Sequence, residues 1–171
     1  LLFDAGIPGA LAERRLGVFG IDIRKVDGVI ISHDHSDHVC HAGSFQRKYG
    51  LPLYATPRTL EAAERMHRLG RLSDVNLFFS GGRLDFGTLS VETIPTPHDG
   101  LDGSAFVVDA GGTRLGLMTD LGHVFDELVD IFPSLDAVVL ESNFDPEMLR
   151  RGSYPAFLKK RITGPGGHLS N

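Results

Sequence analysis

The chain has 171 residues, a net charge of −5 and 42% hydrophobic residues, which suits one globular domain that builds its own core. These values exclude disorder and fibrous repeats as the main description. The single cysteine, Cys40, excludes an internal disulfide framework. Because no apolar run approaches the ~18 residues of a membrane span, we expect a soluble, cytoplasmic protein with no membrane partner.

The first half of the chain predicts strands and helices in alternation. Short apolar or β-branched runs indicate strands, whereas Pro or Thr starts followed by Gly stops indicate helices. In chain order these are a strand that ends at Asp4, a helix over 8–19, a strand over 29–32, a helix over 39–49, a strand over 53–55 and a helix over 57–69.

The second half predicts mostly strands. They cover 77–79, 83–86, 89–94, 105–108, 113–118 and 137–140, with helices over 124–131 and 146–151. Gly81-Gly82 is interpreted as a turn between two of these strands, and Ala110-Gly111-Gly112 is the strongest hairpin signal in the chain. The whole pattern favours a layered α/β or α+β fold over a regular parallel array.

A dense group of metal-ligand residues follows the predicted strand over 29–32. His33, His35, Asp37 and His38 form the pattern HxHxDH, which has little chance of arising by accident. His33 and His35 can project together from extended chain, while Asp37 and His38 lie in the following turn and face a second point. The spacing therefore predicts two pairs of ligands for two neighbouring metal ions, in preference to a merely solvated polar turn.

Two further residues occupy comparable positions. His98 follows the strand over 89–94, and Asp120 follows the strand over 113–118. A carboxylate at position 120 could bridge two cations about 3.5 to 4 Å apart. Imidazole and carboxylate suit Zn²⁺, and also Mn²⁺ or iron. Taken alone, His98 could be an ordinary loop residue and Asp120 a helix N-cap.

These elements resemble the metallo-β-lactamase fold hydrolases. The family signature is a strand-terminal Asp-x-Gly, then HxHxDH, then a separate His and a separate Asp, and this sequence presents them in that order from Asp4 to Asp120. Within the family the chain is similar to the WalJ (YycJ) subgroup, which is exonuclease-like. The matching segments are 2–6, 48–55, 141–143, 154–159 and 167–171.

The resemblance implies a fold. We expect an αββα sandwich of two mixed sheets with outer helices, formed by residues 1–171 as a single domain. Members of the family continue beyond the position of Asn171 through a helix and a strand that carries the last metal-binding His. The chain also begins inside what should be the first sheet, so the resemblance implies a domain that is incomplete at both termini.

The resemblance also implies roles for individual residues. His33, His35 and His98 would hold one metal ion, Asp37 and His38 the other, Asp120 would bridge them, and Asp4 would orient a ligand imidazole. His168 is expected to protonate the leaving oxygen, with Glu141 as its partner, because a neighbouring carboxylate stabilises the imidazolium that a general acid requires. A metal ligand or a frayed terminal residue is the alternative for His168.

The implied activity is hydrolysis at a dinuclear site. Two divalent ions, with Zn²⁺ first and Mn²⁺ or iron as alternatives, would carry a bridging hydroxide that Asp37 orients. The favoured substrate is a phosphodiester, either nucleic acid or a small molecule, which makes a phosphodiesterase, nuclease or exonuclease. The alternatives are a glyoxalase II-like ester or thioester hydrolase, a lactone hydrolase, or a catalytically inactive metal-binding fragment. A second copy of the chain is a further candidate partner.

Other polar residues receive plainer interpretations. Cys40 is expected to pack and His41 to lie at the rim of the site. His67 and the basic residues over 150–151 and 159–161 are expected on solvated faces in preference to a polyanion contact. No aromatic stacking platform for nucleic acid stands out in the sequence.

Overall fold

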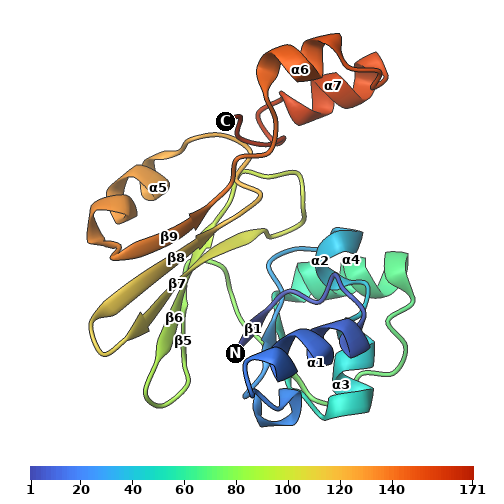
Figure 1. Cartoon of the computed structure of the whole chain (residues 1–171), viewed down its shortest axis with the longest axis vertical. Helices are drawn as coiled ribbons and strands as arrows, with labels where there is room; N and C mark the ends of the chain where they lie inside the picture. The colour runs from blue at the N-terminus through green and yellow to red at the C-terminus, as the bar shows by residue number, and fades with distance from the viewer. The chain divides into compact units, whose positions relative to one another are not determined.

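The computed structural model describes all 171 residues, and its strands form two sheets. The sheets belong to two compact units, which are described one at a time (Figure 1). Unit 1 comprises Leu1–Phe79 with Gly100–Asp102, and unit 2 comprises Ser80–Asp99 with Gly103–Asn171. None of the helices has the length and apolar character needed to cross a membrane.

The sheet of unit 1 has four parallel strands in sequence order. They are β1 (Leu2–Phe3), β2 (Val29–Ile30), β3 (Leu53–Ala55) and β4 (Val75–Leu77). Parallel neighbours need a crossover, and helices supply it. These are α1 (Gly9–Val18), α2 (Ser36–Val39), α3 (Ala42–Tyr49) and α4 (Pro57–His67), with a 3₁₀ turn over Ile23–Lys25. This unit is thus the regular parallel array that the sequence pattern did not favour.

The core of unit 1 lies between this sheet and its helices. Strand residues such as Val29 and Leu53 are fully buried, as their apolar β-branched runs predict. Phe45 of α3 and Ala63 of α4 pack in the same cluster. The amphipathic helices therefore bury one face on the sheet and expose the other to solvent.

One predicted helix starts later than expected. The helix expected over 39–49 is α3, which begins at Ala42, and the short helix α2, which was not predicted, ends at Val39 with a break at Cys40 and His41. The His41 N–H donates to the Ala5 carbonyl, and the Ala5 N–H donates to the His38 carbonyl. The turn after β1 thereby takes up backbone groups at the break, and α2 becomes a separate short helix beside β1.

The sheet of unit 2 is mixed and five-stranded. Its order is β5 (Arg83–Asp85), β6 (Ser90–Pro95), β7 (Ser104–Ala110), β8 (Thr113–Met118) and β9 (Ala137–Leu140). The first four strands are antiparallel to their neighbours, and β9 is parallel to β8. The expectation of two sheets in a metallo-β-lactamase-type α/β fold is confirmed, although only this second sheet is mixed.

The two predicted glycine turns have different outcomes. Gly111 and Gly112 both have positive φ, and they close the β7–β8 hairpin between the paired residues Ala110 and Thr113. The turn at 81–82 joins no hairpin, because β4 pairs with β3 and β5 pairs with β6. The predicted turn between two strands is therefore present, and the two strands that it connects belong to different sheets.

Helices α5 (Asp126–Ile131), α6 (Pro146–Arg151) and α7 (Ala156–Ile162) belong to unit 2, with a 3₁₀ turn over Phe132–Ser134. Leu128 of α5 packs in a core with strand residues such as Val107 and Met118. Asp145 caps α6 by accepting the Met148 N–H, and Pro146 occupies the first helical position. Figure 1 shows α6 and α7 side by side near the C-terminus.

In the turn between β1 and α1, Gly6 lies so close to the backbone of Asp37 that a larger residue would not fit. A methyl group added at Gly6 would overlap the carbonyl oxygen of Asp37, whereas one added at Gly17 of α1 would meet nothing within 4 Å. We expect Gly6→Ala to lower the free energy of unfolding by ~1–3 kcal/mol, because the backbone must shift. Gly17→Ala should raise it by up to ~1 kcal/mol through helix propensity. Urea unfolding measures both changes, and equal stabilities of the two variants would contradict this account.

Candidate metal centre

The ligand residues of unit 1 lie where parallel strands end. Asp4 directly follows β1, and His33 follows β2 by three residues. The carboxyl ends of parallel strands share one edge of a sheet, which is the usual place for a ligand site in α/β folds. The HxHxDH segment then turns into α2, which carries Asp37 and His38.

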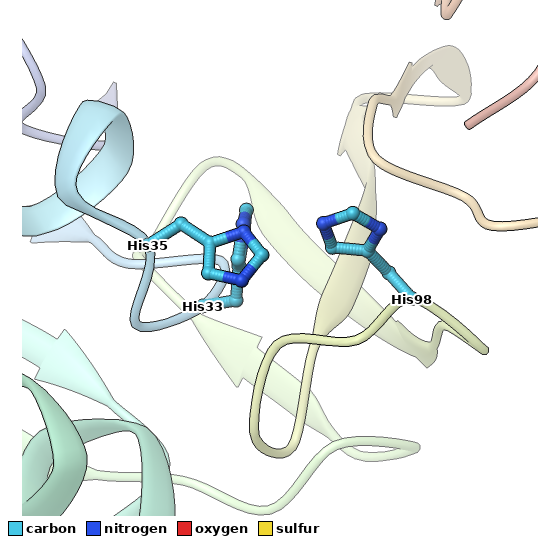
Figure 2. A group of neighbouring side chains, drawn as sticks. All are labelled: His33, His35 and His98. Carbon is cyan, nitrogen blue, oxygen red and sulfur yellow. The ribbon is translucent and has the colours of Figure 1, made fainter. Parts of the chain in front are cut away.

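Three of the motif's imidazoles lie together at this edge. The ring centroids of His33 and His35 are 4.5 Å apart, and those of His33 and His38 are 4.1 Å apart. Figure 2 shows the His33 and His35 side chains on the loop after β2, with their rings at a steep angle to each other. His33 is buried, while His35 and His38 are half-buried. The three imidazoles of the motif therefore lie together within unit 1.

Asp4 organises this group through its carboxylate. It accepts the Ser32 N–H at 2.7 Å, the Ser32 hydroxyl at 2.9 Å and His38 Nδ1 at 2.7 Å. The Ser32 oxygen also lies 2.9 Å from His33 Nδ1. The Asp4 carboxylate only accepts, so His38 carries a proton on Nδ1. The Ser32 hydroxyl donates its own proton to Asp4, so its oxygen accepts from His33 Nδ1, which also carries a proton. Both imidazoles therefore present the Nε2 lone pair to a ligand. Ser32 is a positioning residue that the sequence reasoning did not identify.

The residue between the first two histidines also has a structural role. Asp34 is buried; its Oδ1 accepts the Leu101 N–H at 2.7 Å, and its carbonyl lies 2.8 Å from His67 Nε2. The interpretation of His67 as a solvated residue is therefore wrong, because this half-buried imidazole of α4 contacts the backbone of the motif. It thereby helps to fix the loop that carries His33 and His35.

Asp37 differs from the other motif residues. Its side chain is 80% exposed, and its Oδ2 lies 3.7 Å from His38 Nε2. The structure therefore places Asp37 beside His38 but leaves its carboxylate open to solvent.

Unit 2 gathers a second set of ligand residues by the same topological principle. β6 and β8 run in the same direction because each is antiparallel to β7, and β9 is parallel to β8. The carboxyl ends of all three strands consequently meet at one edge of the sheet. His98 follows β6, Asp120 follows β8 and Glu141 follows β9. His98 and Glu141, which are 43 positions apart in the sequence, thereby follow strands that end at the same edge.

His98 is held in one tautomer. Its Nδ1 lies 2.8 Å from the carbonyl oxygen of Gly167, an atom that can only accept. The proton is therefore on Nδ1, and Nε2 keeps its lone pair. Figure 2 shows the His98 side chain projecting from the loop after β6. This imidazole is buried, so its orientation is fixed by the surrounding chain.

His168 is paired with Glu141. The Glu141 side chain is only 5% exposed; its Oε1 lies 2.5 Å from His168 Nδ1, and its Oε2 accepts the N–H groups of Leu121 and Leu169. The terminal segment is held in place because the Asn143 N–H donates to the Leu169 carbonyl. The expected contact between these two side chains is thus present, and His168 is well anchored in spite of its position near the end of the chain.

The donor set of unit 2 fits a divalent metal ion. One ligand atom each from His98, Asp120 and His168 lie within 4.8 Å of one another. Asp120 has a φ of +54° and Asp4 a φ of +64°, in the left-handed region that few non-glycine residues adopt. Such strain is typical of functional positions. Imidazole Nε2 and carboxylate oxygen are the atoms that Zn²⁺ and similar ions take from proteins.

A cavity of about 270 Å³ opens beside this set, wholly within unit 2. His98 and His168 are among its lining residues. Five further lining residues are ones that the sequence reasoning did not assign to the site: Asn143, Tyr154, Leu158, Arg161 and Ile162. Three of these lie in segments similar to the WalJ subgroup, and Arg161 belongs to the basic run over 159–161.

Comparison with known families decides the classification. A family model described as a beta-lactamase superfamily domain matches residues 1–163. The chain belongs to the beta-lactamase superfamily. The match extends through both units, and it includes every candidate ligand from Asp4 to Asp120.

Curated relatives cover the whole chain. It is 37% identical over 173 residues to exodeoxyribonuclease YycJ of Bacillus anthracis, and 35% identical over 173 residues to exodeoxyribonuclease WalJ of Streptococcus pneumoniae. Both alignments include 100% of this chain, which spans 65% and 64% of the length of these relatives. A ribonuclease J of Sinorhizobium meliloti is 30% identical over 137 residues, covering 78% of this chain and 22% of the relative.

Solved structures support the fold. Zn²⁺-bound PqqB of Methylobacterium extorquens superposes with a TM-score of 0.67 at 18% identity, covering 84% of this chain and 54% of that protein. The metallo-β-lactamase fold protein YhfI of Bacillus subtilis gives a TM-score of 0.62 at 21% identity, covering 84% and 60%. At these identities the likeness concerns the fold alone.

The Asp4 network predicts the behaviour of an isosteric substitution. Asp4→Asn keeps the size of the side chain and tolerates a positive φ, but an amide in place of Oδ2 would direct a second donor at His38 Nδ1. We expect Zn²⁺ affinity to fall about 10- to 100-fold. Competition with a chromophoric chelator measures this loss. Asp27→Asn, at an exposed position of unit 1, is the matched control and should change nothing. Unchanged affinity in Asp4→Asn would refute the orienting role.

Proposed function

We propose that this chain is the catalytic part of a metal-dependent phosphodiesterase that removes nucleotides from the end of a DNA strand. The observation that carries the proposal is the cluster of oriented imidazoles after β2 in unit 1, together with the group of His98, Asp120 and His168 in unit 2, within a superfamily chain that is 37% identical to an exodeoxyribonuclease. We take residues 1–171 as one domain, which the family match across both units supports.

The ligand sets are proposed to serve two divalent ions. In this assignment His33, His35 and His98 hold one ion, Asp37 and His38 the other, and Asp120 bridges them. The order of these residues in the sequence and the Nε2 orientation of His33, His38 and His98 support it. When bound, two such ions lower the pKa of bound water and screen the charge of a phosphodiester. Zn²⁺ is the first candidate, with Mn²⁺ or iron as alternatives.

The protein's own residues would then act on protons and orientation. Asp37, with its exposed carboxylate beside His38, is proposed to orient the attacking water. His168, in contact with the buried Glu141, is proposed to protonate the departing 3′ or 5′ oxygen of the nucleotide. A cytoplasmic location completes the proposal and rests on the single cysteine, which suits a reducing compartment.

The acid role of His168 can be separated from a ligand role by the leaving group. Bis(p-nitrophenyl) phosphate releases a nitrophenolate that needs no proton, whereas DNA releases an alkoxide that does. We expect His168→Ala to lose about 10²- to 10⁴-fold in turnover on single-stranded DNA, and much less on the aryl ester. Steady-state rates with added Mn²⁺ or Zn²⁺ measure both. Equal losses on both substrates would instead identify His168 as a metal ligand.

The same assay tests the proposed activity as a whole. Chelation should abolish hydrolysis of both phosphodiesters, added metal should restore it, and His33→Ala should remain inactive. Arg83→Ala changes an exposed ion pair on β5 and serves as the control with full activity. Hydrolysis of a thioester or lactone without phosphodiester turnover would indicate a small-molecule hydrolase. Failure to bind even one equivalent of metal would rule out the dinuclear centre.

A further inference from the structure

The cavity of about 270 Å³ beside His98 and His168 has no occupant in the chemistry described above. The ring centroids of these two imidazoles, here called the imidazole side, are 4.9 Å apart. A group seated in this cavity therefore lies directly beside the atoms proposed to hold metal and to donate a proton. Such a group would belong to the part of the substrate attached to the scissile phosphate.

The volume of the cavity limits the size of that group. About 270 Å³ is at the small end of ligand pockets, which run from ~300 to 1,000 Å³. A single nucleoside is an occupant of suitable size, whereas a stretch of duplex is far larger. The cavity thus has room for one terminal residue of a strand, and a second hollow of about 400 Å³ shares Asn143 and Tyr154 with it.

The lining residues Asn143, Tyr154, Leu158, Arg161 and Ile162, here called the wall, have the character of a nucleobase site. Tyr154 is 56% exposed and offers an aromatic ring, with the aliphatic side chains of Leu158 and Ile162 beside it. A flat, largely apolar heterocycle stacks well on such a surface. Asn143 adds an amide that can both donate and accept at the edge of a base.

Arg161 contributes a fixed plane to the same wall. Its Nε and Nη2 donate to Asp99 Oδ2 and Oδ1 at 2.6 and 3.1 Å. This two-point contact holds the guanidinium in place and balances its charge. The wall therefore favours a neutral planar group over a phosphate, and the phosphate is left to the imidazole side.

The segment that forms this wall is built to stay in place. The Lys159 ammonium donates to the carbonyl oxygens of Arg150 and Gly152, which ties α7 to the end of α6. Hydrogen bonding to Arg150, and secondarily to Arg151, lowers the pKa of the Glu147 carboxyl, so these three side chains stay charged and paired at neutral pH. A preformed wall loses little entropy when it binds a ligand.

The charge of the same segment suits a nucleic-acid strand. The 18 residues from Asp145 to Ile162 carry five Lys and Arg side chains against two acidic ones, in a chain whose net charge is −5. Local positive charge attracts a phosphate backbone even when the whole protein is acidic. Most of these basic side chains are exposed, as the sequence analysis expects.

We propose that this cavity is the subsite for the terminal nucleoside of a single DNA strand, with Tyr154 stacking on its base. This inference rests on the proposed function and adds the substrate form to it. We expect the terminal base to leave its partner when it enters the cavity, so the enzyme would act on single-stranded or frayed ends and release one nucleotide at a time.

Ligand binding tests the subsite without catalysis. Chelator-treated protein is titrated calorimetrically with dAMP and with 2-deoxyribose 5-phosphate, which share the phosphate and differ in the base. We expect dAMP to bind about tenfold or more tightly, from one stacked base. Tyr154→Ala should abolish this difference, and Tyr154→Phe should keep it. Phe157→Ala, which removes a 75% exposed ring of α7 outside the cavity lining, is the matched control.

Strand hydrolysis supplies the second readout. Wild-type protein should degrade an oligonucleotide with an intact terminal base about tenfold faster than one with an abasic end, and Tyr154→Ala should degrade both at the slower rate. A variant that retains the preference, or wild-type protein that binds the two small probes equally, overturns the subsite. Base-dependent binding without any metal-dependent hydrolysis would keep the subsite and refute the nuclease proposal.

Discussion

Three imidazoles of this protein are suited to a metal ion because each has an oxygen atom at Nδ1. Asp4 and Ser32 provide it for His38 and His33, and the Gly167 carbonyl provides it for His98. An imidazole held in this way keeps its Nε2 lone pair pointed in one direction, so little side-chain entropy is lost when a metal ion binds. Much of the local structure serves this end, including the turn after β1 that hydrogen-bonds to the backbone at the end of α2.

Strand topology explains why the candidate ligands come from separate parts of the sequence. In unit 1 the parallel strands place Asp4 and the HxHxDH motif at one edge. In unit 2, β6 and β8 are both antiparallel to β7, and β9 is parallel to β8. The carboxyl ends of β6, β8 and β9 therefore lie at a single edge of the sheet. The candidate ligands of this chain thus lie at the edges of two different kinds of sheet. The chain supplies oriented nitrogen donors in both units and a buried carboxylate, Glu141, behind His168.

Local signals in the sequence predicted most of the elements, whereas long-range partners were harder to predict. The hairpin at 110–112 and the strand over 137–140 depend on residues within a few positions, and both are confirmed. The parallel partner of β4 lies about twenty residues earlier, and no local pattern encodes it. The ligand residues stood out because the motif is dense. Tyr154 stood out only as part of a segment similar to the WalJ subgroup, because the cavity that it lines is formed by residues from 98 to 168.

The left-handed backbone at Asp4 and Asp120 ties backbone strain to the presence of a carboxylate. Glycine would adopt both conformations without strain, whereas a residue with a side chain costs of order 1–3 kcal/mol there. At position 4 this cost is offset by the hydrogen bonds that Asp4 accepts from Ser32 and His38. At position 120 the carboxylate lies 3.3 Å from His168 Nδ1. Glycine at either position would therefore relax the backbone and remove these contacts in the same step.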